Sequence, residues 1–352
     1  MNSVPVQDAE GLRAEVPDLR RITVVLPTYN RAESVRRCVL GILACDVEGL
    51  EVELRVVDDG SPDNTAEVIE EVRRRYDGPI RLVYDRQPNA GQSSARNRAI
   101  RAAETDVLLF IDDDCVPDPG WIRGLVSADW SPGVGAVGGR LVAAQKGNWI
   151  SDYCRYIRYN EFPPDDGPLT FVNSANCAYL ARALQEVDGY ECSLPRGVDH
   201  DLGWRVMLAG YRMLYQPEAV VHHFHRESLR VVLKDCWTRG ASNTVRSQLW
   251  ASGKPVTPLR LLREYWVLAL SLLDLLALPW QMAQIAREGV APRNWLPYAL
   301  LGWTRRAAGR CGKISMLRRI LKGRQPLQRS SRVVKRVPPP PHAPHWVRAS
   351  RE

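Results

Sequence analysis

The stretch DVLLFIDDDCVPDPGW, residues 106–121, decides the fold. It opens with five apolar residues, 107–111, whose continuous hydrophobicity is typical of a strand buried on both faces of a sheet. Three consecutive aspartates end this run, and the prolines that follow prevent an ordinary continuation of the strand. Ligands of an open parallel sheet bind outside the carboxyl ends of its strands. The stretch therefore predicts three acids at a ligand-binding edge.

The three acids, Asp112, Asp113 and Asp114, repel one another when ionised, and a cation relieves that repulsion. Carboxylate oxygens suit Mg²⁺ or Mn²⁺, which also bind substrate phosphates. A plain acidic turn is the alternative, because aspartate is a common turn residue. The stretch alone favours neither interpretation, so the other strand ends have to decide.

Strands and amphipathic helices alternate before residue 106, as is typical of a parallel sheet with helices on its faces. Each expected strand there is followed by a polar segment. The carboxyl ends of parallel strands meet at one edge, so the chemistry of these segments converges and favours a binding site over isolated turns. The expected strands are 22–26, 52–57 and 80–84, and the segments are 27–31 (PTYNR), 58–61 (DDGS) and 89–94 (NAGQSS).

Residues 133–138 (GVGAVG) match the spacing of a dinucleotide-binding loop. Such a loop has to follow a strand and open a helix. Here it follows an expected helix and leads into the apolar run 136–142. We therefore predict a turn and a strand at this position, and no dinucleotide site.

Two polar groups lie further along the chain. Asp199 and Asp201 open an expected helix and point in different directions, because they are two residues apart. Asp199 is either a helix cap or a general base. Three histidines, His222, His223 and His225, end a late strand, and this favours one of them as a metal ligand.

Five motifs occur in the order seen in family 2 inverting glycosyltransferases of the GT-A fold, which residues 21–245 resemble. Each motif alone is weak, whereas the ordered set is specific. The resemblance implies an α/β, Rossmann-like GT-A domain with a mostly parallel central sheet flanked by helices. The motifs are Pro-Thr-Tyr-Asn-Arg (27–31), Val-Asp-Asp-Gly-Ser (57–61), Asn-x-Gly-x-x-x-Ala-Arg-Asn (89–97), Asp-Asp-Asp (112–114) and Asp-x-Asp-Leu-Gly-Trp-Arg (199–205).

The resemblance also implies roles for individual residues. Those implied in nucleotide binding are Pro27, Thr28, Tyr29, Arg31, Asp59, Arg96, Asp112 and Asp113. Asp59 corresponds to the acid that binds the base, and Asp113 has no role of its own. The implied metal ligands are Asp114, Asp112 and His223, with Asp112 placed nearer the ribose and His222 and His225 as competitors of His223.

Asp199 resembles the catalytic base of the family. The family usually has Glu-Asp at this place, and Val198 replaces the glutamate. This difference puts the acceptor contacts of that glutamate in doubt more than the base itself.

The function implied is an inverting, Mg²⁺- or Mn²⁺-dependent glycosyltransferase. It moves a sugar from a nucleotide-diphosphate sugar to a hydroxyl of a glycan or lipid-linked acceptor, in cell-surface polysaccharide or glycolipid synthesis. A nucleotidyltransferase is an alternative, but it needs a basic glycine-rich phosphate loop, and residues 27–31 are not one. A non-catalytic nucleotide- or glycan-binding protein is another, and Asp112, Asp114 and Asp199 argue against it.

The C-terminal region differs in composition from the rest. We expect an N-terminal extension (1–20), the transferase domain (21–245), a hydrophobic and basic helical region (246–330) and a disordered, proline-rich basic tail (331–352). The apolar run from residue 265 offers about fourteen residues before Pro279, whereas a membrane span needs about 20. Asp274 within it would also be costly in lipid.

This region is expected to lie on a membrane without crossing it. The formal net charge of the chain is +8, and basic residues crowd the part after Arg305, where Glu352 is the one acid. Such a tail favours an anionic partner, and the neighbouring tryptophans favour a membrane surface over nucleic acid. A helical appendage packed on the catalytic domain or a partner subunit is the alternative. The eight dispersed cysteines and the polar start of the chain predict a cytoplasmic protein, peripheral on the cytoplasmic face.

Overall fold

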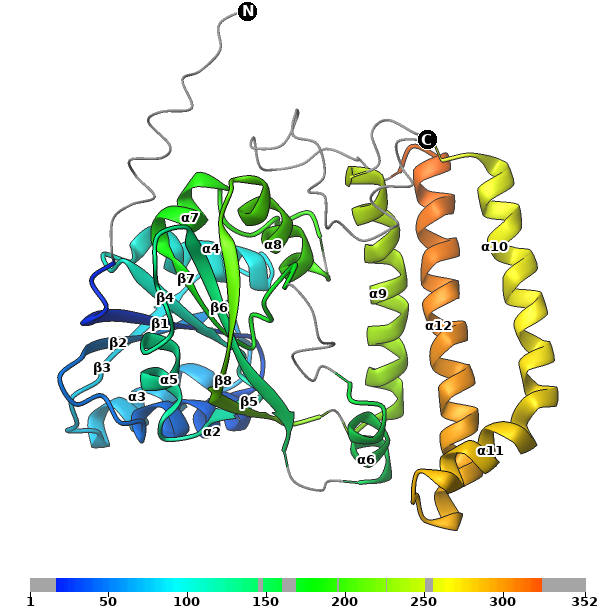
Figure 1. Cartoon of the computed structure of the whole chain (residues 1–352), viewed down its shortest axis with the longest axis horizontal. Coiled ribbons are helices and arrows are strands. Elements are labelled where there is room, and N and C mark those ends of the chain that lie inside the picture. Colours follow the sequence, from blue (N-terminus) through cyan, green and yellow to red (C-terminus); the bar gives the residue numbers. More distant parts are fainter. Residues whose placement is uncertain are drawn as a thin grey trace, which may run out of the picture.

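The computed structural model describes residues 17–144, 148–159, 169–194, 196–225, 227–250 and 256–324. The expected tail, 331–352, and most of the expected N-terminal extension lie outside these ranges. The described chain has an α/β part and a part made of long helices, which lie beside each other in Figure 1.

One eight-stranded sheet forms the centre of the α/β part, in the order β3-β2-β1-β4-β7-β6-β8-β5. The predicted buried strand is β4, whose five residues are all buried next to β1. The strands are β1 (Arg21–Thr28), β2 (Glu51–Asp58), β3 (Arg81–Arg86), β4 (Val107–Ile111), β5 (Cys115–Pro117), β6 (Val134–Ala143), β7 (Asn176–Leu180) and β8 (Arg212–His223).

The sheet is mixed, which corrects the prediction of a mostly parallel sheet. β1 to β4 are parallel to one another, and β6 is parallel to β8. β7 is antiparallel to both β4 and β6, and β5 is antiparallel to β8. β8 is long, and its last five residues, 219–223, alternate between buried and more exposed, as strands with one solvated face do. The fold is thus GT-A-like with a mixed sheet. One half of the sheet is parallel and carries the polar strand ends, and the other half contains both parallel and antiparallel pairs.

Helices cover the sheet, and their apolar faces explain why. In α2 (Ala32–Leu43), for example, the buried residues are Val35, Cys38, Val39 and Ile42, which recur at helical spacing. The remaining helices of this part are α3 (Thr65–Arg75), α4 (Gln92–Ala102), α5 (Trp121–Val126), α7 (Ala181–Glu186) and α8 (Val198–Leu208), whereas α6 (Trp149–Tyr156) packs against the long helices (Figure 1). The glycine-rich segment 133–138 enters β6 and opens no helix, so its prediction as a turn and strand is confirmed.

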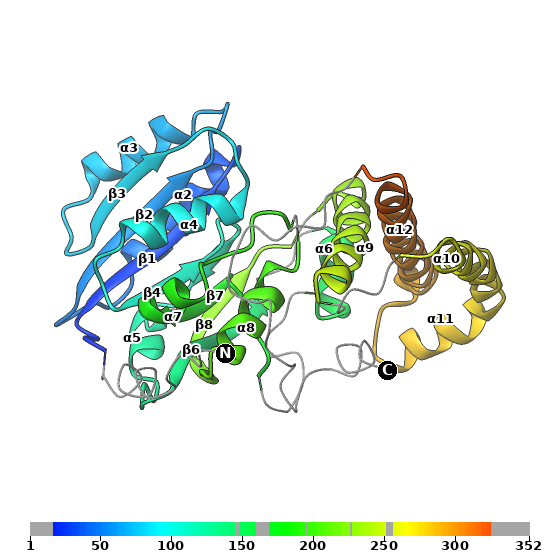
Figure 2. The same ribbon diagram turned by 90° about the horizontal axis from the view of Figure 1, so that it is seen from above.

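The helical part contains α9 (Leu229–Trp250), α10 (Pro258–Leu270), η1 (Ser271–Ala277), α11 (Leu278–Arg287), η2 (Pro292–Asn294) and α12 (Trp295–Leu321). α9 lies next to the α/β part, α12 beside α9, and α10 on the far side of α12 (Figure 2). α9 and α12 approach so closely that a Cβ on Gly240 would lie 1.9 Å from the carbonyl oxygen of Gly309. α9 runs without a break through residue 245, where the sequence led us to expect a domain boundary.

The apolar run after residue 265 is not one continuous α-helix. α10 ends at Leu270, a 3₁₀ segment follows, and α11 starts at Leu278 with Pro279 in its first turn. Asp274 in the 3₁₀ segment lies 3.7 Å from a guanidinium nitrogen of Arg306 in α12. Over the ranges that the structure describes, none of the helices combines the length and the hydrophobicity that crossing a membrane requires.

Glu264 fastens α10 to α12. Its side chain is 1% exposed, and its carboxylate accepts from Arg310 at 2.8 Å and from Lys313 at 2.6 Å. Burial would raise the pKa of Glu264, but Lys313 and Arg310 outweigh it and hold the pKa below its usual range. The charged form therefore stabilises the packing of these two helices.

Replacing Glu264 with glutamine should lower the free energy of unfolding by about 1–3 kcal/mol, because two cations lose a buried partner. A lowered folded pKa gives stability that is present above the unfolded pKa and lost on acidification, so the difference from wild type should shrink below about pH 4. Urea unfolding at several pH values measures both. Asp274→Asn makes the same acid-to-amide change at a side chain that is 47% exposed and 3.7 Å from Arg306, so it should change stability by less than about 0.5 kcal/mol; an equal loss in both variants would contradict the assignment.

Candidate functional site

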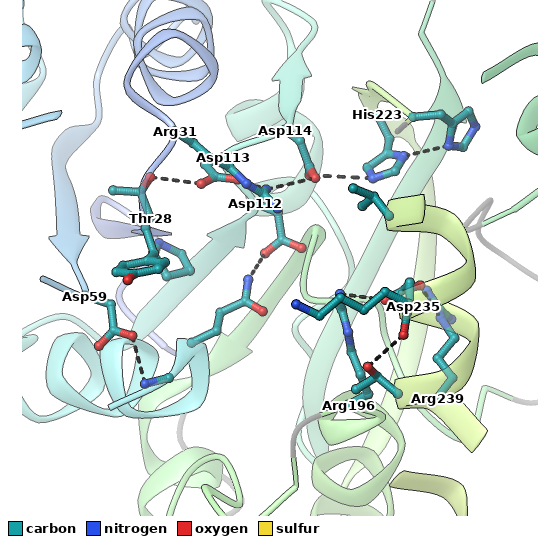
Figure 3. Close-up of a pocket in the computed structure, with 18 of the residues that line it drawn as sticks. Thr28, Arg31, Asp59, Asp112, Asp113, Asp114, Arg196, His223, Asp235 and Arg239 are labelled. Carbon is teal, nitrogen blue, oxygen red and sulfur yellow. Dashed lines mark hydrogen bonds and ion pairs between the residues drawn. The ribbon is translucent and has the colours of Figure 1, made fainter. Parts of the chain in front are cut away.

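A cavity of about 560 Å³ lies where the carboxyl ends of β1, β2 and β4 face α9 (Figure 3). All of the predicted site residues except Arg96 and Asp199 line it. Those on its wall are Pro27, Thr28, Tyr29, Arg31, Asp59, Asp112, Asp113, Asp114 and His223. The parallel half of the sheet thus gathers segments that are far apart in the sequence.

Asp113 ties β1 to the end of β4. Its carboxylate accepts from the hydroxyl of Thr28 at 2.9 Å and from the guanidinium of Arg31 at 2.6 Å. Burial raises the pKa of Asp113 to about 6, against the attraction of Arg31 and with a further increase from Asp114. Asp113, whose role the sequence left open, therefore holds the wall of the cavity together.

Asp112 also lines the cavity, and its partners come from α4. Its Oδ1 accepts from the amide of Gln92 at 2.9 Å and from Arg96 at 2.6 Å. Arg96 is 1% exposed, lies over the ring of Tyr190 and does not line the cavity. In this structure Arg96 supports Asp112 from behind the cavity wall, and its expected contact with the nucleotide stays a prediction.

Asp114 faces the histidine strand. Its Oδ1 lies 3.5 Å from Nε2 of His223, and its Oδ2 accepts from Arg31 at 3.2 Å. Nδ1 of His223 lies 3.2 Å from Nδ1 of His225, which fixes the orientation of the ring. Burial lowers the pKa of His225 to about 4, with a contribution from His223, so this partner is neutral at pH 7.

His222 faces away from this pair. It is 2.9 Å from Asp118 and does not line the cavity. His222 and His223 are neighbours on a strand, and neighbours on a strand point to opposite faces. Of the three histidines considered from the sequence, His223 is the one that meets an aspartate of the 112–114 run.

The donors at this place fit a divalent cation. A carboxylate oxygen and an imidazole nitrogen face one another on the cavity wall, and Mg²⁺ and Mn²⁺ complete their coordination with water and substrate phosphates. Within the described ranges, no three or more histidine, cysteine, aspartate or glutamate side chains are grouped so as to hold a metal ion. Two of the three predicted ligands, Asp114 and His223, are thus together, while Asp112 is held by Arg96.

Asp59 organises the loop after β3. One carboxylate oxygen accepts from the amide of Gln87 at 2.7 Å and from the backbone of Ala90 at 2.9 Å, and the other from the backbone of Gly91 at 2.8 Å. The side chain is buried at the edge of the cavity. Asp59 thus shapes the predicted nucleotide pocket through residues 87–91.

Asp59→Asn should disorder this loop, because an amide nitrogen would face N–H donors where an oxygen now accepts. We expect a loss of about 1–3 kcal/mol of stability and weaker nucleotide binding. Thermal unfolding and nucleotide titration measure the two effects. Asp63→Asn, which alters a nearby loop acid on the same strand connection, is the matched control, since Asp63 contacts Thr65 and Ala32 and is absent from the cavity wall. Unchanged nucleotide affinity in Asp59→Asn would remove Asp59 from the pocket.

Asp199 lies in the first turn of α8, and the cap position is taken by Gly197 in a left-handed conformation. Its carboxyl hydrogen-bonds with Ser174, while its Oδ1 is buried without a hydrogen bond. Burial raises the pKa of Asp199, and the charge of Arg96 offsets part of that effect. Asp199 does not line the cavity, but it shares Arg96 with Asp112, which does.

Asp201, the other acid of this turn, is structural. It is 1% exposed and forms an ion pair of 2.8 Å with Arg205 one turn later. Arg205 in turn donates to the backbone oxygens of Val187 and Gly189. The two acids therefore have different surroundings. Asp201 belongs to a packing network, whereas Asp199 has a buried oxygen without a hydrogen bond.

The opposite wall of the cavity comes from α9, and the sequence did not reveal it. Asp235 accepts from Arg239 at 2.8 Å and pairs with Arg196 at 2.6 Å (Figure 3). Burial would raise the pKa of Asp235, but Arg239 and Arg196 hold it below its usual range. The spacing of Asp235 and Arg239 is typical of a helical ion pair, yet only the fold shows that this face of α9 meets the strand ends.

Comparisons with known proteins agree with this arrangement. Residues 23–188 match the model of the family described as glycosyl transferase family 2. A pre-mycofactocin glycosyltransferase of Mycobacterium tuberculosis is 32% identical over 222 residues, 61% of this chain and 45% of the relative. An N-acetylglucosaminyltransferase of Azorhizobium caulinodans is 33% identical over 264 residues, 70% of this chain and 65% of the relative. This chain thus spans less than two thirds of the length of either relative.

The fold has a counterpart among solved structures. A mannosyltransferase of Pyrobaculum calidifontis, solved in complex with GDP-Man and Mn²⁺, superposes with a TM-score of 0.53 at 19% sequence identity. The superposition covers 87% of this chain and 91% of the other. The ordered motifs, the strand-end cavity and these matches agree on one point: residues 23–188 of this chain match glycosyl transferase family 2.

Proposed function

We propose that this protein is an inverting glycosyltransferase that moves a sugar from a nucleotide-diphosphate sugar to an acceptor hydroxyl, in the synthesis of a cell-surface polysaccharide or glycolipid. One observation carries the proposal. Asp114 and His223 face each other on a cavity whose floor and walls are the strand ends that resemble the nucleotide pocket of the family. The names of the relatives support a sugar as the transferred group.

The donor binds along the β1, β2 and β4 side of the cavity in this proposal. Asp59 and the loop it holds lie beside the base, and Arg31, kept in place by Asp113, lies toward the diphosphate. Asp114 and His223, with Asp112 nearby, would hold a Mg²⁺ or Mn²⁺ ion, which neutralises the diphosphate and stabilises the leaving group. The P. calidifontis mannosyltransferase was solved with Mn²⁺, which supports a divalent ion of this kind.

Asp199 is the general base of the proposed reaction. Its raised pKa and its unpartnered oxygen suit proton removal, whereas the pKa of Asp235 is lowered by its two arginines. Asp199 takes the proton of the acceptor hydroxyl while the hydroxyl oxygen bonds to the anomeric carbon and the bond to the diphosphate breaks. Attack from the face opposite the diphosphate inverts the configuration. Catalytic groups often come within hydrogen-bond reach only when substrates are bound.

A donor-panel assay tests this proposal. With a divalent metal ion and the correct donor, a glycosyltransferase releases a nucleoside diphosphate and forms a glycoside of inverted configuration. A nucleotidyltransferase would instead release pyrophosphate from a nucleoside triphosphate. A non-catalytic binding protein would bind the donor and release neither product, and that result would overturn the proposal.

We also propose that the protein is peripheral on the cytoplasmic face of the membrane, through α10 to α12 and the basic tail. Large apolar side chains on α10 are exposed, including Leu259 at 75% and Trp266 at 66%. Amphipathic surfaces with basic neighbours bind anionic lipid surfaces. Cell fractionation is the test: full recovery in the supernatant at low salt without detergent would contradict membrane binding.

A further inference from the structure

A second cavity, of about 1110 Å³, lies between α9, α10, η1 and α12. Its wall is strongly basic. The cationic side chains are Arg158, Arg239, Arg246, Arg260, Arg305, Arg306, Arg310 and Lys313, and Asp274 is the one acid on the wall among the residues described. None of these residues has a part in the proposed chemistry of the first cavity.

Carboxylates on and behind the wall offset part of this positive charge. Asp274 pairs with Arg306, buried Glu264 pairs with Arg310 and Lys313, and Asp235 pairs with Arg239. The wall itself thus carries eight cationic side chains and one carboxylate, that of Asp274, within the described part of the chain. A cleft lined by one sign of charge concentrates ions of the opposite sign.

An exposed apolar stripe borders the same cavity. Its members are 44% to 80% exposed, recur every three or four residues, and are Leu259, Leu262, Trp266, Leu270, Leu273, Leu276 and Trp280. Leu270 belongs to the stripe and also to the cavity wall. α10 and α11 form the edge of the helical part that is farthest from the sheet (Figure 2). An anion site and an outward apolar surface therefore meet on one helix.

The second cavity also adjoins the first. Tyr159 and Arg239 line both cavities, and Cζ of Arg239 lies 4.7 Å from the centre of the Tyr159 ring. The hydroxyl of Tyr159 hydrogen-bonds with Asp235, which belongs to the wall of the first cavity. A molecule whose anionic group sits in the second cavity is thus held next to the proposed site of transfer.

We propose that the second cavity binds the phosphate or diphosphate head of a membrane-anchored acceptor, while the apolar stripe rests on the bilayer. This inference rests on the proposed function, because it assigns the substrate class of the same transfer. The ligand chemistry is a phosphate ester, which the arginines bind with paired N–H donors. Its lipid chain leaves the cavity on the side where Leu270 joins the stripe.

The test uses the full chain and phosphatidylcholine vesicles that contain a polyisoprenyl monophosphate. Vesicles with phosphatidylglycerol at the same surface charge are the reference. We expect co-sedimentation with the monophosphate vesicles to be about tenfold tighter than with the reference, because phosphate contacts add to surface attraction. The variant R260Q/R306Q should lose that preference, and inorganic pyrophosphate should compete with the lipid in the wild type.

The matched control is R287Q/R293Q, which removes two charges from the same helical part at positions absent from the cavity wall. It should keep the preference for the monophosphate. Equal losses in both double variants would show surface electrostatics only and would overturn the proposal. A second result would also overturn the proposal: pyrophosphate binding that depends on Arg260 and Arg306 but is not displaced by the lipid. The ligand of the second cavity would then be a soluble anion.

Nucleoside diphosphate titration of the same preparations separates this inference from the proposed function. If the protein binds the monophosphate lipid as described but binds no nucleotide, the proposed transfer fails and the phosphate site stands. If it binds nucleotide and transfers sugar but shows no preference for the lipid, the proposed function stands and the acceptor assignment fails.

Discussion

Asp199→Asn should lower turnover by about 10²–10⁴-fold, the usual contribution of a positioned general base. Nucleotide affinity should stay within about twofold, because Asp199 does not line the donor cavity. The protein should be at least as stable as wild type at neutral pH. A raised folded pKa means that the ionised form is disfavoured by folding, so removing that charge relieves a cost.

The raised pKa of Asp199 also predicts how turnover depends on pH. The base must be ionised to accept a proton, so turnover should fall as pH decreases through the pKa of Asp199. Because burial raises that pKa, the acidic limb should lie above the ordinary aspartate value of about 3.9. Steady-state rates across pH measure it, after a check that the nucleotide still binds at each pH.

Asp201→Asn is the matched control for this prediction. It lies in the same turn but pairs with buried Arg205, so its loss should lower the melting temperature and leave the turnover of the folded fraction nearly unchanged. Normal turnover in Asp199→Asn would remove Asp199 from the mechanism. An acidic limb below the ordinary aspartate range would instead direct attention to Asp235, whose pKa is lowered.

Asp114→Asn should have the second large effect, on the dependence of the reaction on a divalent metal. Loss of even an outer partner of a metal site weakens binding by about 10–100-fold, and loss of a ligand should exceed that. The metal concentration for half-maximal turnover should therefore rise by more than about 100-fold. Mn²⁺ titration of turnover measures it, and Mn²⁺-dependent nucleotide affinity gives a second readout that needs no catalysis.

Adjacent histidines provide the control. His223→Gln should resemble Asp114→Asn, because its Nε2 faces Asp114, whereas His222→Gln should behave as wild type, because His222 faces Asp118. The two variants make the same chemical change one residue apart on β8. Equal metal dependence in both would show that the metal, if one is used, is not held by His223.

The parts of this molecule that are local in sequence were predictable from it. Continuous hydrophobicity defined β4 at Val107–Ile111 and placed β1, because strands buried on both faces are apolar throughout. β2 alternates between buried and less buried residues in its first half. That the expected strand ends meet at one cavity was also predictable, because it follows from the parallel pairing of the strands. Parallel neighbours bring their carboxyl ends to one edge, whatever the details of packing.

The direction of the later strands and the partners of individual side chains were harder to predict from the sequence. β7 inserts antiparallel next to β4, and a buried five-residue strand reads the same in either direction. Asp112, Asp113 and Asp114 are chemically identical, yet each has different partners. Asp112 binds Arg96, and Asp113 binds Thr28 and Arg31. Asp114 also binds Arg31 and faces His223. Alternation after the end of a strand sends successive side chains in different directions, and only their surroundings give them roles.

By itself, the sequence determined the α/β class, the strand-end acids and the interruption of the apolar run after residue 265, because these depend on hydrophobic runs, spacing and proline. The tertiary structure decided that Asp201 forms a buried ion pair while Asp199 keeps one oxygen without a hydrogen bond. It also decided that Asp235 and Arg239 of α9 close the cavity together with Arg196. It also decided that basic residues from α9, α10 and α12 surround a second cavity. Such features arise from contacts between segments that are distant in the chain, and no local pattern encodes which faces will meet.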